Sequence, residues 1–171
     1  MRRIIAIVLL FYAANASAQY SASTPTAFSA GLELGIPTNS IYSIGLGASG
    51  KVEIPASKQV FIAVTAGFTT FFYKSNLYRS SLTPSPAGFV PLKAGAKYYF
   101  NQGVYVEGEL GTAIETNYLK HDLFAFSIGP GFIVPINDKH GVDVGLRYEN
   151  WSDHQLQQTA IRFAYRFGRE P

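Results

Sequence analysis

The chain has 171 residues and no cysteine, and 47% of its residues are hydrophobic while only 15% are charged. An average globular domain carries about a quarter of its residues as charged side chains. Without cysteine, the chain has no disulfides, no thiolate nucleophile and no cysteine-based metal site. The length fits a single domain. After the N-terminus no apolar run is long enough for a membrane helix, so the apolar residues must be spread periodically.

The first eighteen residues have the pattern of a cleaved signal peptide. Arg2 and Arg3 are followed by an apolar segment from Ile4 to Ala14 and by the small residues Ala16-Ser17-Ala18. Removing the two arginines lowers the formal charge from +3 to +1 (3 − 2). No polybasic tract is left, and we therefore expect no nucleic-acid partner. We predict a signal peptide at 1–18, a periplasmic lead-in at 19–26 and a β-barrel at 27–171.

From residue 28 onward, apolar and small or polar residues alternate with a period of two, which is typical of β-strands. Turn-forming residues such as Asn101-Gln102-Gly103 separate the alternating segments. Strands of about 10–14 residues suit a tilted membrane-spanning barrel. The pattern predicts about eight strands, at 28–36, 42–54, 60–72, 89–100, 104–115, 123–136, 141–151 and 158–167.

The two faces of these strands differ in charge, which distinguishes a membrane barrel from a soluble lipocalin-like one. A soluble barrel fills its interior with large apolar side chains and exposes its charges. Here the large apolar residues share a face without charges, as hydrocarbon requires, because a charge near the midplane costs about 2–4 kcal/mol. The opposite face predicts a narrow lumen with an ion-pair network of Glu33, Lys51, Glu53, Lys93, Lys97, Glu107, Glu109, Asp143, Arg147, Glu149, Arg162 and Arg166.

Within that network we expect Lys93 or Lys97 to pair with Glu107 or Glu109, because the strands that carry them form a hairpin. We expect bulges at Pro91 and at Gly129-Pro130-Gly131, since proline cannot donate to a β-ladder.

Aromatic residues cluster at the predicted strand ends. With both termini in the periplasm, the longest connection, 74–88, lies on the external side. The clusters then form two girdles at the membrane interfaces. The external girdle contains Phe71-Phe72-Tyr73, Phe124, Phe126, Tyr148 and Trp151; the periplasmic girdle contains Tyr98-Tyr99-Phe100, Tyr105, Tyr165 and Phe167.

The Ala18-Gln19 junction, the alternating strands and the closing segment from Ala160 to Phe167 resemble the small OmpA-like and OmpX-like outer-membrane β-barrels. The resemblance covers the whole chain after residue 18. It implies a closed, antiparallel, eight-stranded up-and-down barrel in contact with outer-membrane lipid and lipopolysaccharide. It also implies that Phe167 corresponds to the terminal aromatic residue that the barrel-insertion machinery reads, although four more residues follow it here.

The sequence favours a structural or surface-interaction role, with an extracellular ligand bound through the loop 74–88. Tyr78, Arg79 and Leu82 are the contact residues that we expect there. A narrow pore for small solutes is the first alternative, although an ion-paired lumen of eight strands is largely filled.

A lipid A acyl hydrolase or acyltransferase is the second alternative. It would need Ser152 and His121 or His154 to meet at the external rim, with Asp122 or Asp153 orienting the base. The three histidines share no metal-ligand spacing, and we expect neither a metal nor a cofactor.

Overall fold

The computed structural model describes residues 26–38, 40–75, 85–101, 103–117, 122–137, 139–152 and 156–168. The predicted signal peptide lies outside these residues and stays a prediction. Within them, no helix is long and apolar enough to cross a membrane. The chain forms β1 (Ala27–Pro37), β2 (Tyr42–Pro55), β3 (Val60–Tyr73), β4 (Ala87–Asn101), β5 (Val104–Glu115), β6 (Asp122–Asn137), β7 (His140–Trp151) and β8 (Leu156–Phe167).

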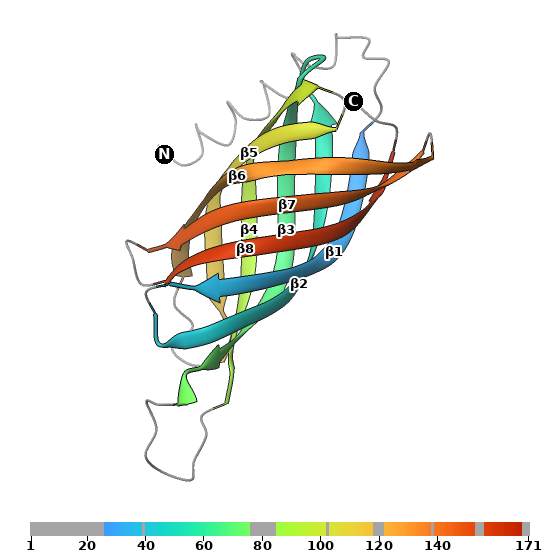
Figure 1. Cartoon of the computed structure of the whole chain (residues 1–171). Coiled ribbons are helices and arrows are strands. Elements are labelled where there is room, and N and C mark those ends of the chain that lie inside the picture. The colour runs from blue at the N-terminus through green and yellow to red at the C-terminus, as the bar shows by residue number, and fades with distance from the viewer. Residues whose placement is uncertain are drawn as a thin grey trace, which may run out of the picture.

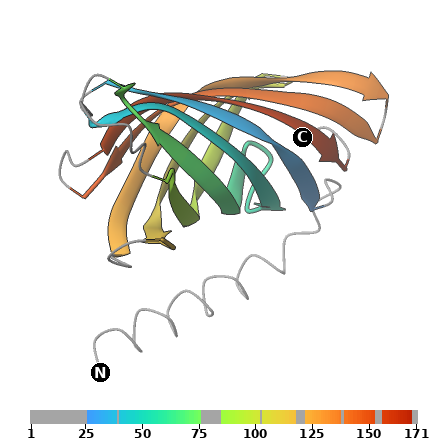
Figure 2. The ribbon, with the colours of Figure 1, turned by 90° about the horizontal axis from the view of Figure 1, so that it is seen from below.

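The eight strands form one closed antiparallel barrel in which each strand pairs with its neighbours in the sequence. Pairing of β1 with β8, from Phe28 opposite Phe167 to Pro37 opposite Gln158, closes the barrel. In Figure 1 the tilted strands β6, β7, β8 and β1 cross in front of β3 and β4. Seen from below in Figure 2, β1 in blue lies between β2 and β8. The predicted fold class and strand count are confirmed, and no strand end differs from the prediction by more than two residues.

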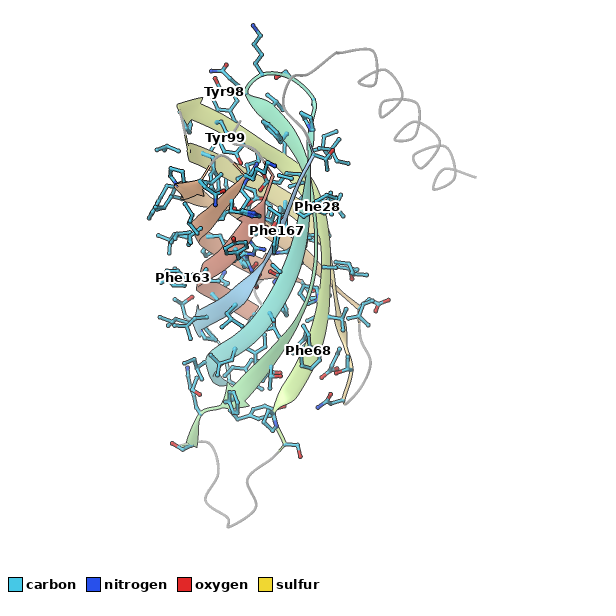
Figure 3. The ribbon with its side chains drawn as sticks, turned by 90° about the vertical axis from the view of Figure 1, so that its right-hand side faces the viewer. Phe28, Phe68, Tyr98, Tyr99, Phe163 and Phe167 are labelled. Atoms are coloured by element: carbon cyan, nitrogen blue, oxygen red, sulfur yellow. The ribbon has the colours of Figure 1, made fainter. Side chains whose placement is uncertain are left out.

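The barrel has two unlike ends. β1 begins and β8 ends at the same end, together with the short turns that join β2 to β3, β4 to β5 and β6 to β7. We call this the terminal end; the opposite end, where β3 leads toward β4, is the loop end (Figure 1). Figure 3 places Tyr98 and Tyr99 near the terminal end and Phe68 toward the loop end.

The alternation in the sequence corresponds to the two surfaces of the barrel. The large side chains on the outward face are apolar and exposed, as Leu32 is at 70% and Phe163 at 56%. An apolar surface that surrounds a whole barrel is not stable in water, whereas hydrocarbon accommodates it. Inward side chains are buried, and most of the charged residues of the barrel are among them. The fold is therefore that of a transmembrane barrel.

The bulges expected at the two prolines are not found. Across Pro91, β3 and β4 keep one register, from Ala66 opposite Leu92 to Thr69 opposite Phe89. A missing N–H removes a ladder bond but requires no inserted residue, so the strand continues. The register shifts instead beside strand ends, between Tyr42 and Ile44, Tyr99 and Asn101, and Pro135 and Asn137.

The second proline leaves a similar interruption. Pairing of β6 with β7 runs from Ala125 opposite Trp151 to Ile128 opposite Tyr148, and it resumes at Gly131 opposite Gly145. No pair is formed in between, at Gly129 and Pro130. We call this interruption the β6–β7 gap.

Candidate functional site: the barrel lumen

All twelve charged residues predicted for the lumen lie on the inward face of the barrel. Ten of them are buried, at 8% exposure or less. The other two, Glu107 and Arg147, have side chains that are 10% and 11% exposed. The period of two positions them because every second residue of a closed barrel points inward.

Ion pairs join these twelve residues into one unbranched chain of alternating sign. It begins at the terminal end, where Arg166 contacts Glu53 and Glu53 contacts Lys97 at 2.7 Å. Lys97 also contacts Asp143 at 2.9 Å, and Asp143 lies 4.0 Å from Arg162.

The chain continues from Arg162 toward the middle of the barrel. Arg162 lies 3.6 Å from Glu33, and Glu33 contacts Arg147 at 2.5 Å. Arg147 contacts Glu149 at 2.6 Å, and Glu149 contacts Lys93 at the same distance.

Its last members are Lys93, Glu109, Lys51 and Glu107. Lys93 lies 3.5 Å from Glu109, Glu109 lies 3.7 Å from Lys51, and Lys51 contacts Glu107 at 2.5 Å. In this network every acid has a base beside it, so no member carries an uncompensated buried charge.

Neutral donors complete the coordination of the carboxylates, and sequence reasoning missed them. The Thr65 hydroxyl donates to Glu109 at 2.5 Å, and the Gln158 amide donates to Glu149 at 2.6 Å. The Ser49 hydroxyl donates to Glu33. At the terminal end the Tyr99 hydroxyl donates to Glu53 at 2.9 Å and the Tyr105 hydroxyl donates to Asp143. Like the charged residues, they occupy inward positions of the period-two pattern, so that pattern could have identified them.

The expected hairpin pairs form only in part. Lys93 does lie beside Glu109, its predicted partner. Lys97 stands directly opposite Glu107 in the ladder, yet its ammonium group contacts Glu53 and Asp143 and lies 3.6 Å from the centre of the Tyr105 ring. The expectation was wrong for Lys97 because the lumen is narrow enough for a lysine to reach the far wall, where two carboxylates are available.

Aromatic clusters occupy the lumen on both sides of the charges, which the girdle prediction did not foresee. The cluster at the loop end consists of Phe71, Ala87, Phe89, Ala113, Ala125, Trp151 and Leu156. Trp151 meets Phe89 and Phe71 edge-on, with ring centres 5.3 and 5.6 Å apart. The cluster at the terminal end consists of Phe61, Tyr99, Tyr105 and Ile133.

Four residues assigned to the girdles are therefore inside the barrel: Phe71, Trp151, Tyr99 and Tyr105. Consecutive strand residues point to opposite sides, so a run of aromatics such as Phe71-Phe72-Tyr73 cannot lie wholly on the lipid face. Other predicted girdle residues do face outward, among them Phe72, Phe124, Tyr148, Tyr98, Phe100, Tyr165 and Phe167.

One small cavity lies between the charges of the described residues. A cavity of about 10 Å³ lies beside Lys51, Glu107, Glu109, Arg147 and Arg162. A buried water needs about 10–15 Å³ measured in this way, so the cavity has room for about one water.

Several predicted residues lie outside the described part of the chain. These are the loop residues Tyr78, Arg79 and Leu82, and also His121, Asp153 and His154. Asp122 is the exposed first residue of β6, and Ser152 accepts a hydrogen bond from the Phe124 N–H at 2.9 Å. Phe167 ends β8, is 46% exposed and meets the Tyr165 ring edge-on. In the described ranges no group of three or more histidine, aspartate or glutamate residues is placed to hold a metal ion.

A closed barrel of eight strands, apolar outside and ion-paired inside, defines a small transmembrane β-barrel of the outer-membrane class. No protein-family model matches the chain, and no curated protein matches it in sequence. Solved structures match its fold.

One of them is the attachment invasion locus protein Ail of Yersinia pestis, with a TM-score of 0.58 and 16% identity over 85% of this chain and all of Ail. Ail in complex with the heparin analogue sucrose octasulfate matches with a TM-score of 0.54 and 15% identity, over 83% of this chain and 97% of that one. Neisserial surface protein A matches with a TM-score of 0.58 and 14% identity, over 83% of this chain and 96% of its own. At identities this low, the matches show a shared fold and nothing more specific.

The inward position of Trp151, the single tryptophan of the chain, can be tested by fluorescence quenching. In bilayers of lipids with brominated acyl chains, we expect its emission to remain unquenched, because the ring is 1% exposed inside the barrel. The control is Tyr148→Trp in a Trp151→Phe background, which places the reporter on the outward face of the same strand. Equal quenching of both proteins would show that Trp151 faces lipid.

Lys97 tests the ion-pair chain. Lys97→Met keeps the length of the side chain but leaves Glu53 and Asp143 without their shared cation, which we expect to lower the free energy of unfolding by about 3–5 kcal/mol. Lys58→Met, in an exposed turn, should change it by less than about 0.5 kcal/mol. Urea titration in lipid vesicles measures both, and similar small effects would mean that the Lys97 pairs contribute little.

Proposed function

We propose that the protein is an outer-membrane barrel with a closed lumen that acts through its external loops. The matches to outer-membrane proteins and the apolar exterior support this location. The terminal end then faces the periplasm and the loop end faces outward, because bacterial barrels keep their short turns on the periplasmic side.

The observation that carries the closed lumen is the unbroken chain of twelve charges between two aromatic clusters. A solute would have to displace both clusters, which include Trp151 and Phe89 at one end and Phe61 and Tyr99 at the other. It would also have to separate buried ion pairs, and each separation leaves charges unpaired in a medium of low dielectric constant. A pore remains the alternative, and conductance decides between them.

We do not propose a catalytic role for Ser152. Its hydroxyl accepts the Phe124 N–H, and its own N–H donates to the Phe124 carbonyl at 2.7 Å. These contacts support a turn-forming role at the loop end. Lipid A composition in a strain that overproduces the protein is the direct test of the enzyme alternative.

The base of the long loop is firmly attached to its surroundings, which supports a role in presenting the loop. Lys74 donates to the Ser40 carbonyl at 2.8 Å on one side, and Asn117 donates to the Pro86 carbonyl at 3.0 Å on the other. A segment whose base is fixed by neighbouring turns can present contact residues at low entropic cost. One solved structure of this fold holds a heparin analogue. We therefore choose sulfated glycans as the first ligand class to test, with Arg79 as the cationic contact.

In planar bilayers we expect the folded protein to produce no stepwise currents, because buried ion pairs and two aromatic clusters stand in the way of a solute. A large porin inserted under the same conditions serves as the positive control. Discrete channels that appear only after addition of the folded protein would overturn the closed lumen and favour the pore.

Binding to immobilised heparin tests the loop. Replacing residues 77–86 with a short glycine–serine linker should abolish retention at physiological salt, and Arg79→Ala should weaken it. Lys58→Ala removes a cation from the opposite end and should leave retention unchanged. If the shortened protein is retained like the full chain, the loop does not bind sulfated glycans.

A further inference from the structure

An apolar groove interrupts the otherwise convex outer surface of the barrel. It lies across β5 to β8 and has a volume of about 600 Å³. Its rims include Phe132 and Phe163, which are 47% and 56% exposed. Its lining consists of Val104, Pro130, Gly131, Phe132, Val144, Gly145, Leu146, Ile161 and Phe163, none of them charged or polar in its side chain.

The groove lies between two large outward side chains, because the smaller Val144 of β7 stands opposite Phe132 of β6 and opposite Phe163 of β8. Gly131 and Gly145 stand opposite each other across β6 and β7, at the edge of the β6–β7 gap. On their inner side lies the Tyr105 ring, 2.2 Å from where a side chain on Gly131 would begin. No larger residue fits at position 131 without moving that ring. The inward tyrosine therefore fixes the glycine from the lumen side, while the hollow on the outer surface comes from the small outward Val144 between the two phenylalanines.

The depth of the groove assigns it to one leaflet. Val144 and Leu146 are four and six residues from His140, where β7 begins at the terminal end. At roughly 3.3 Å per residue and a tilt of roughly 40°, they lie about 10–15 Å below that rim. Half of the hydrocarbon core is about 15 Å thick. The groove thus lies within the leaflet at the terminal end, which is the periplasmic one.

A cation stands in the turn at the terminal end of the two strands that form the floor of the groove. Lys139 is exposed in the turn that joins β6 to β7, the two strands that form the floor. An ammonium group at this level meets the phosphate of a lipid headgroup, whose acyl chain runs down into the bilayer. Lys58, in the turn between β2 and β3, is also exposed at the same end, but neither of these strands lines the groove.

From these features we infer a specific site for a periplasmic-leaflet phospholipid, with its phosphate at Lys139 and one acyl chain in the groove over Gly131 and Gly145. The inference rests on the proposed membrane location. A linear acyl chain fits a hollow between two aromatic rims. A second barrel would present a convex surface to that hollow and leave it unfilled.

The experiment uses the chain folded into vesicles of phosphatidylethanolamine and phosphatidylglycerol that contain phosphatidylglycerol with a diazirine in the middle of one acyl chain. Faster migration of unboiled protein in electrophoresis first shows that the barrel is folded and inserted. After illumination, mass spectrometry locates the labelled residues. We expect label to concentrate at Val144, Leu146 and Phe163, in excess over the equally outward Ile62 and Val64 of β3.

Three variants separate a specific site from general lipid contact. Lys139→Gln should lower labelling in the groove about fivefold, the loss expected for one lysine near a membrane surface. Lys58→Gln, its matched control, should not. Val144→Phe fills the groove and should abolish the excess, while Val64→Phe on the opposite face should leave it intact.

The outcomes distinguish the two proposals. Even labelling around an inserted barrel, or equal effects of the two lysine variants, overturns the phospholipid site and leaves the membrane location standing. A chain that shows no faster band and stays soluble without lipid overturns the membrane location and the lipid site together.

Discussion

The structure depends on one constraint: a charge inside an eight-stranded barrel has no room for bulk water and must be neutralised by another side chain. The chain meets it with six acids and six bases that alternate through the lumen from Arg166 to Glu107. The cost of desolvating these groups is offset only if every member keeps its partners. Hydroxyls from Thr65, Tyr99 and Tyr105 saturate the carboxylates further. The interior is thus one cooperative network, in which each pair depends on its neighbours.

Closure of both ends follows from the same constraint. Water that entered between the pairs would compete for their hydrogen bonds and weaken them, since charges attract less strongly in a high dielectric. The Trp151 cluster at one end and the Tyr99 cluster at the other separate the network from the aqueous phases. This arrangement underlies the proposal that the protein acts through its external loops and its lipid-facing wall.

The sequence predicted the strands and the composition of the two faces, because hydrocarbon and lumen impose opposite demands at every second residue. It did not predict which lysine meets which carboxylate. Lys97 passes its ladder neighbour Glu107 and reaches Glu53 and Asp143, which depends on the stagger of strands around the closed barrel. Parity would have placed Trp151 and Tyr105 inside, since they alternate with outward Tyr148 and Val104. The girdle prediction placed both on the lipid face because it considered only the preference of aromatic residues for membrane interfaces.

The lumen also constrains which residues the barrel wall can carry on its inner side. Tyr105 must lie inward to bond Asp143, and its ring leaves only glycine possible at position 131. The side-chain position of Gly131 faces the lumen, so the hollow on the lipid side has another origin: the outward Val144 of β7 stands between Phe132 and Phe163. In a barrel whose wall is one strand thick, alternate residues of one strand thus meet separate demands. The inward ones complete the ion-pair network, and the outward ones shape the surface that the lipid contacts.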